Sequence, residues 1–90
     1  MKTLNDNQKE FFHTLGEIQE TVVALAMCKK EDEIENLLYD VTYDTIYSIL
    51  EVLDGCTKDN LSYRIIKEDG NDVINEGIQL HGICPYYIKN

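Results

Sequence analysis

Apolar residues recur every three or four positions over the first half of the chain, which is the spacing that gives a helix one apolar side. In the first stretch they are Leu4, Phe11, Leu15, Ile18, Val22 and Leu25, with Phe12, Val23 and Ala26 widening one shoulder. This pattern predicts a helix over about residues 6–28. Its N-terminus can be capped by Asn5 with Gln8, or by Thr3 with Asp6.

A second stretch has the same spacing and two marked ends. Its apolar side consists of Ile34, Leu37, Leu38, Val41, Ile49, Val52 and Leu53. The acidic run 31–33 favours a helix N-terminus, and Gly55 is suited to end a helix in the left-handed conformation. We therefore expect a second helix over about residues 33–54. The short turn before it makes the two helices an antiparallel hairpin.

After the second helix the sequence favours strands. Residues 61–67 are rich in β-formers, a turn cluster follows, and residues 73–80 can return as a second strand with Gly77 at a bulge. The predicted fold class is therefore α+β, with an antiparallel two-helix hairpin followed by a small antiparallel β-hairpin and a short C-terminal segment. The whole chain, 1–90, is expected to form a single domain.

The C-terminal segment contains the only proline. Pro85 is expected to open a short helical turn that lays Tyr86, Tyr87 and Ile88 over the core.

The charge balance restricts the partners of the chain. Seventeen acidic residues against eight basic ones give a formal net charge of −9. Such a chain repels nucleic-acid phosphates and anionic membrane surfaces, so we expect neither partner, whereas a basic protein would be attracted. The odd count of three cysteines, the polar start and the lack of a long apolar run predict a cytoplasmic protein with free thiols.

The cysteines and histidines give weak signals for chemistry. Cys28, Cys56, His81 and Cys84 are the residue types that bind zinc, but a whole helix of about 30 Å separates the first two. A nucleophilic pair of Cys84 with His81 lacks a sequence signal for a third orienting group or an oxyanion hole. We therefore expect no catalytic residue, no cofactor and no metal.

The second helix carries a further apolar side, opposite to the first. At 100° per residue it contains Tyr39, Tyr43, Tyr47 and Leu50, with Asp40, Asp44 and Glu51 as an acidic border. Tyrosines with a charged rim are typical of protein interfaces. Three interpretations remain open: burial of the helix between the first helix and the β-hairpin, a homo-oligomer interface, or a surface for another protein.

The leading hypothesis is a non-enzymatic protein–protein interaction or regulatory module that forms a homodimer. A monomer this small leaves either the tyrosine side or one shoulder of the first helix exposed. One alternative is an acidic inhibitor of the immunity-protein kind, which masks a basic enzyme. The other is an enzyme or metal protein whose site carries no recognisable motif.

Overall fold

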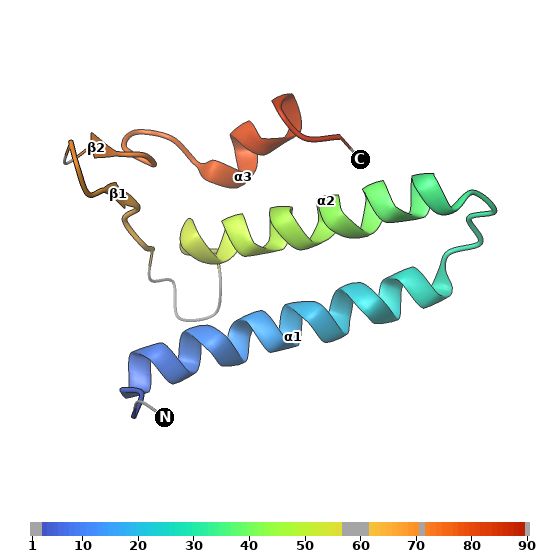
Figure 1. Cartoon of the computed structure of the whole chain (residues 1–90), viewed down its shortest axis with the longest axis horizontal. Coiled ribbons are helices and arrows are strands. Elements are labelled where there is room, and N and C mark those ends of the chain that lie inside the picture. Colours follow the sequence, from blue (N-terminus) through green and yellow to red (C-terminus); the bar gives the residue numbers. More distant parts are fainter. Residues whose placement is uncertain (1–2, 57–61, 71, 90) are drawn as a thin grey trace.

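The computed structural model describes residues 3–56, 62–70 and 72–89. Two long helices, α1 (Asp6–Cys28) and α2 (Ile34–Leu53), lie side by side in antiparallel directions (Figure 1). They are followed by the strands β1 (Ile66–Lys67) and β2 (Asp72–Val73), the helix α3 (Leu80–Ile83) and the 3-10 helix η1 (Cys84–Tyr86). The predicted α+β fold class, a helical hairpin followed by a small β-hairpin and a short C-terminal segment, is confirmed.

The helices begin and end close to the predicted residues. Asn5 accepts a 2.8 Å hydrogen bond from the amide of Gln8, and the Gln8 side chain accepts a 2.9 Å bond from the amide of Asn5. This reciprocal cap satisfies two amides at the start of α1. After α2, Gly55 adopts φ +83°, and its amide donates to the carbonyl of Val52. The left-handed end expected at this glycine is confirmed.

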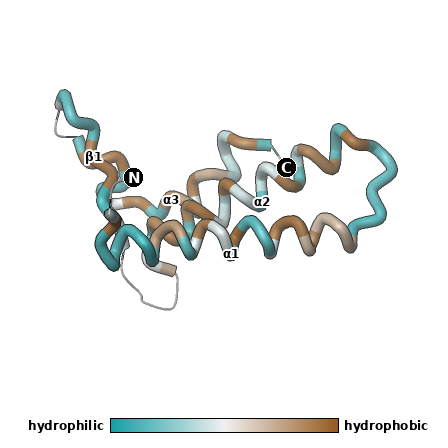
Figure 2. The backbone as a smooth tube through the Cα atoms, turned by 60° about the horizontal axis from the view of Figure 1, so that its bottom comes forward, coloured by the Kyte–Doolittle hydropathy of each residue, from teal (hydrophilic) through white to brown (hydrophobic). Residues whose placement is uncertain are grey.

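The core is thin. Among the described residues, the buried apolar side chains are Val22 of α1, Val52 of α2 and Cys84 of η1. The polar turn between the helices lies at the far end of the hairpin from the strands (Figure 2). None of the described helices is long and apolar enough to cross a membrane.

The two strands are much shorter than the predicted 61–67 and 73–80. They pair antiparallel over two residues only, Ile66 with Val73 and Lys67 with Asp72, and Leu61 lies outside the described residues. The Asn75 side chain explains the early end. It donates to the carbonyl of Tyr63 and accepts from the amide of Ile65, at 2.6 and 3.0 Å, and so occupies groups that a longer ladder would use.

The rest of the predicted second strand turns and becomes helical. Gly77 has φ +68° within a turn rather than at a strand bulge, and α3 begins at Leu80. The chain then runs back along α2 through α3 and η1 (Figure 1). Pro85 lies in the first turn of η1, as expected. The expected covering of the core by Tyr86 and Tyr87 was wrong, because these side chains are 81% and 84% exposed.

Candidate functional site

A buried carboxylate attaches the C-terminal segment to the end of α2. The Asp54 side chain is only 3% exposed and accepts hydrogen bonds from the amides of Leu80 and His81, each of 2.8 Å. Its Oδ2 also lies 2.6 Å from Nδ1 of the His81 ring. These amides open α3 and have no partner within that helix, so Asp54 serves as its cap from 26 residues away. We call this arrangement the Asp54 clasp.

The tyrosines of α2 receive the C-terminal segment along their length. The His81 ring meets Tyr47 edge to face, with centroids 5.5 Å apart, and Tyr47 stacks on Tyr43 at 5.9 Å. Further along, Lys89 Nζ lies 4.7 Å from the centroid of the Tyr39 ring. Since the segment passes Tyr47 first and Tyr39 last, it runs antiparallel to α2. The chain thus covers this side of α2 in part, with α3 and the segment after it rather than with the β-hairpin: Tyr43 and Tyr47 are half-buried, and Tyr39 is 37% exposed.

The clasp sets the charge state of Asp54. Burial alone would raise the pKa of its carboxyl, but hydrogen bonds from the His81 and Leu80 amides and from the His81 ring outweigh burial and lower the pKa. Two other side chains where the C-terminal segment meets α2, Cys84 and Tyr43, have a raised pKa. Burial raises the pKa of the Cys84 thiol. Tyr43 has a raised pKa through desolvation and through the nearby Cys84, Tyr47 and Asp44.

The lowered pKa of Asp54 predicts a specific loss of stability in acid. Because the folded-state pKa lies below the ordinary value of 3.8, the clasp stabilises the fold fully above that value. Its contribution is lost as the pH falls through the folded-state pKa. Urea unfolding between about pH 2 and 6 should therefore show a steeper acid loss for the wild type than for Asp54→Asn. Equal pH profiles for the two proteins would show that Asp54 does not hold the segment.

The surroundings of Cys84, which follows the clasp in sequence, do not favour an activated nucleophile. Asp54 orients His81 as the acid of a catalytic triad orients its base, and sequence reasoning missed this third group. However, Cys84 is buried with a raised pKa, which is the reverse of a reactive thiolate. Within the described ranges, no group of three or more His, Cys, Asp or Glu side chains could hold a metal ion. Cys28 and Cys56 are exposed, whereas Cys84 is buried.

Two of the acids predicted to border the tyrosines, Asp40 and Asp44, lie next to Lys29. Lys29, which follows the end of α1, reaches across to α2 and lies 3.6 Å from Asp40 and 3.5 Å from Asp44. Glu51 is half-buried and lines a hollow between the helices with Thr14 and Ser48. Of the predicted interaction residues, the three tyrosines therefore lie along the C-terminal segment, the three acids lie toward α1, and Leu50 is half-buried on α2. A role of these residues in binding another protein stays a prediction.

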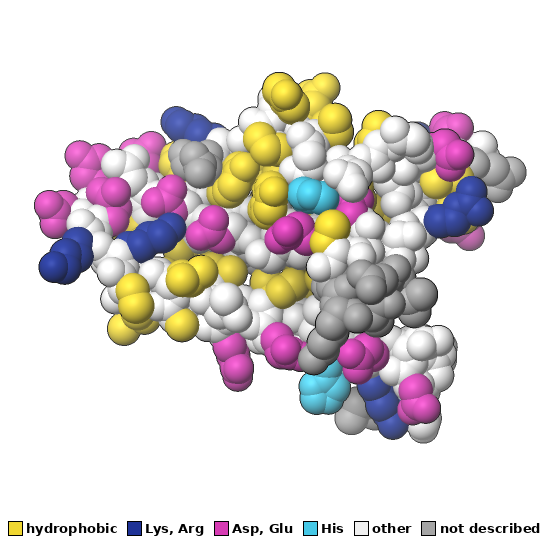
Figure 3. All heavy atoms as spheres, turned by 180° about the vertical axis from the view of Figure 1, so that it is seen from behind, with side chains coloured by type: hydrophobic (Ala, Val, Ile, Leu, Met, Phe, Trp, Pro, Cys, Tyr) yellow, Lys and Arg dark blue, Asp and Glu magenta, His cyan; other side chains and the backbone are white. Residues whose placement is uncertain are grey.

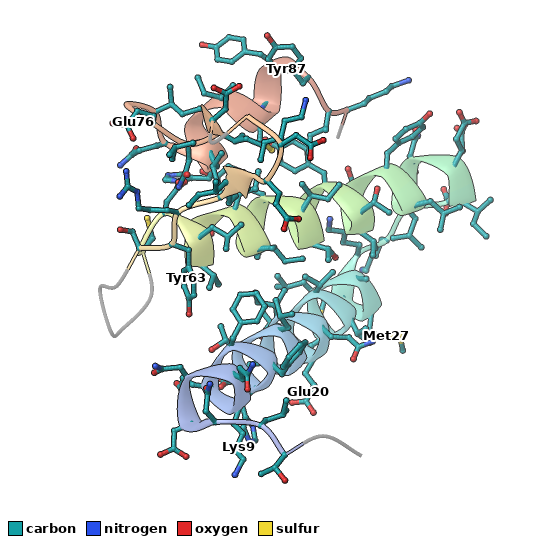
Figure 4. The ribbon with its side chains drawn as sticks, turned by 60° about the vertical axis from the view of Figure 1, so that its left-hand side comes forward. Lys9, Glu20, Met27, Tyr63, Glu76 and Tyr87 are labelled. Atoms are coloured by element: carbon teal, nitrogen blue, oxygen red, sulfur yellow. The ribbon has the colours of Figure 1, made fainter. Side chains whose placement is uncertain are left out.

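A further exposed apolar surface lies along one side of the helical hairpin. A groove of about 500 Å³ opens there between α1 and α2. We define the groove face as five residues that line this opening, Gly16, Gln19 and Val23 of α1 with Thr45 and Ile49 of α2, and five further along the two helices, Phe12, Met27, Leu38, Thr42 and Ile46. Ionisable residues lie at its edges, since Glu35 shares a hollow with Leu38 and Thr42. Its large apolar side chains that are exposed range from Ile46 at 41% to Met27 at 82%. Met27 projects away from α2 (Figure 4).

The total surface agrees with an incomplete core. The chain exposes 7400 Å², whereas a compact monomer of 10.4 kDa exposes about 5,400 Å². Its radius of gyration is 15.2 Å, against about 12 Å for a compact domain of this length. About 2,000 Å² per chain is therefore exposed in excess of the compact value.

Compared with protein-family models, curated proteins and solved structures, the chain matches none of them.

Proposed function

We propose that this chain is a non-enzymatic protein–protein interaction module that binds another polypeptide through the groove face. The single observation that carries the proposal is the set of large apolar side chains exposed on this face, with Phe12, Val23, Met27 and Leu38 each more than half exposed. Exposed apolar patches of this kind mark interaction sites on soluble proteins. The groove offers a concave apolar surface that side chains of a partner can fill.

The tyrosine side of α2 and the groove face differ in how the chain covers them, and this difference supports a binding role for the groove face. The tyrosine side of α2 is occupied by the C-terminal segment, which the Asp54 clasp holds in place. Within the part of the chain that the structure describes, no segment covers the groove face in this way, and Phe12 and Val23 on it are more than half exposed. The part of α1 that packs on α2 is centred on Val22, and the groove face is the shoulder beside it.

A second candidate function is inhibition of a basic enzyme, and the acidic end of the hairpin favours it. Glu31, Asp32, Glu33 and Glu35 are all exposed at the α1–α2 turn, where acidic side chains gather in the space-filling view (Figure 3). A basic partner would be attracted to this end rather than to the groove face. Its binding would weaken as salt screens the charges.

Site-specific photocrosslinking in the native host tests the proposed function. A benzoylphenylalanine in place of Val23 should give a covalent adduct of defined mass, because the partner covers this residue. The matched control is the same group at Glu10, which is exposed and lies about 140° around α1 from Val23. Absence of any adduct from Val23 above the Glu10 level would contradict the proposal. An adduct formed only from a probe at Asp32 would favour the inhibitor function.

A further inference from the structure

The C-terminal segment, residues 80–89, lies on the outside of the fold. Helix α2 lies between α1 on one side and this segment on the other (Figure 1). On the first side, α1 packs on α2 around the buried Val22, and Lys29 pairs with Asp40 and Asp44. These contacts join α1 to α2 without the segment. The helical hairpin can therefore keep them when the segment leaves α2.

The attachment of the segment to α2 is concentrated at its first two residues. There Asp54 accepts hydrogen bonds from the amides of Leu80 and His81 and lies against the His81 ring. After these two residues the segment buries little, since Cys84 is the only buried side chain in residues 82–89. A part of a protein with few buried apolar side chains opens at a lower free energy than the rest. The segment has this character, and the Asp54 clasp is its main attachment.

We infer that the C-terminal segment is a strap that opens as a unit while the helical hairpin stays folded, with the Asp54 clasp as its latch. Opening removes the His81 ring from Tyr47 and the Lys89 ammonium group from Tyr39. The tyrosine side of α2 then becomes accessible in a protein whose two long helices are still paired. The strap thus controls access to the side of α2 whose sequence is typical of an interface. This inference does not depend on a partner at the groove face.

The thiol of Cys84 reports the opening, because it is buried against α2 while the strap is closed. In the full chain with Cys28→Ser and Cys56→Ser it is the only thiol, and dithiobis(nitrobenzoate) labels it. The labelling rate divided by that of the urea-unfolded protein gives the open fraction. This fraction should exceed the unfolded fraction from urea unfolding by at least about tenfold. Adding Asp54→Ala removes the latch and should speed labelling by at least about tenfold.

The matched control weakens the helical hairpin and leaves the contacts of the strap in place. Val22→Ala removes buried methyl groups between α1 and α2, so it should raise the unfolded fraction by about tenfold or more. If the strap opens alone, Val22→Ala leaves the labelling rate of Cys84 within about threefold of the parent rate. Circular dichroism checks that each variant is folded. If Val22→Ala does not fold, Ala24→Gly at an exposed position of α1 weakens the helix instead.

Two results would overturn the inference. Labelling that rises with Val22→Ala in proportion to the unfolded fraction would mean that the segment leaves α2 only when the whole protein unfolds. Labelling that Asp54→Ala does not speed would mean that the clasp is not the latch. Faster labelling with Asp54→Ala, together with an unchanged rate for Val22→Ala, supports a strap that opens on a folded hairpin.

Discussion

Replacing Asp54 by alanine is expected to lower the free energy of unfolding by about 3 kcal/mol. The substitution leaves the amides of Leu80 and His81 without their acceptor and removes the partner of the His81 ring. Each hydrogen bond to a charged group contributes about 1.5–3 kcal/mol, and bonds that share one carboxylate do not add fully. Equilibrium urea unfolding measures the effect, and hydrogen exchange at His81 reports whether the segment detaches before the rest.

Two variants serve as controls for the clasp. Asp44→Ala removes a carboxylate that is 37% exposed and lies 3.5 Å from Lys29, so it should cost less than about 1 kcal/mol. Asp54→Asn keeps one acceptor oxygen, so its loss of unfolding free energy should lie between those of Asp54→Ala and Asp44→Ala. If Asp54→Ala destabilises the protein no more than Asp44→Ala does, the Asp54 clasp does not hold the C-terminal segment.

The second large effect is expected for Val23→Asp, which should weaken self-association by at least about 100-fold. Desolvating a carboxylate without a partner costs about 1.5 kcal/mol or more, and the predicted homodimer would contain one from each copy. Together these costs correspond to a factor of about 100 in the dissociation constant. Sedimentation equilibrium measures the change directly.

Ala24, the next residue in the sequence, provides the control for Val23→Asp. Ala24→Asp introduces the same charge at an exposed position about 100° around α1, outside the groove face. It should leave the dissociation constant within about threefold of the wild-type value. Equal weakening by the two variants would mean that added negative charge, rather than loss of the groove face, opposes association.

Local sequence signals were sufficient to predict the helical hairpin. The spacing of apolar residues, the Asn5–Gln8 cap and Gly55 each act within a few residues, so they could be read without tertiary contacts. The strands could not be predicted in the same way. Their early end depends on the Asn75 side chain, which competes with a ladder whose β-propensity is otherwise favourable.

The clasp was missed because its partners are distant in sequence. One signal for it exists: Asp54 lies at the C-terminal end of α2, where a carboxylate opposes the helix dipole. An acid at such a position is unfavourable unless donors compensate for it, but the sequence does not show which element supplies them. The sequence did predict that either the tyrosine side or a shoulder of α1 is left exposed. Only the path of the C-terminal segment shows that the tyrosine side is covered and the shoulder is not.

Light scattering across protein and salt concentrations tests self-association through the groove face most directly. The expected mass is twice 10.4 kDa, and the dimer should tighten as salt screens the repulsion between two chains that each carry −9. A basic partner would show the opposite dependence on salt. A mass of one chain at every concentration, or a dimer that dissociates as salt rises, would contradict association through the apolar groove face.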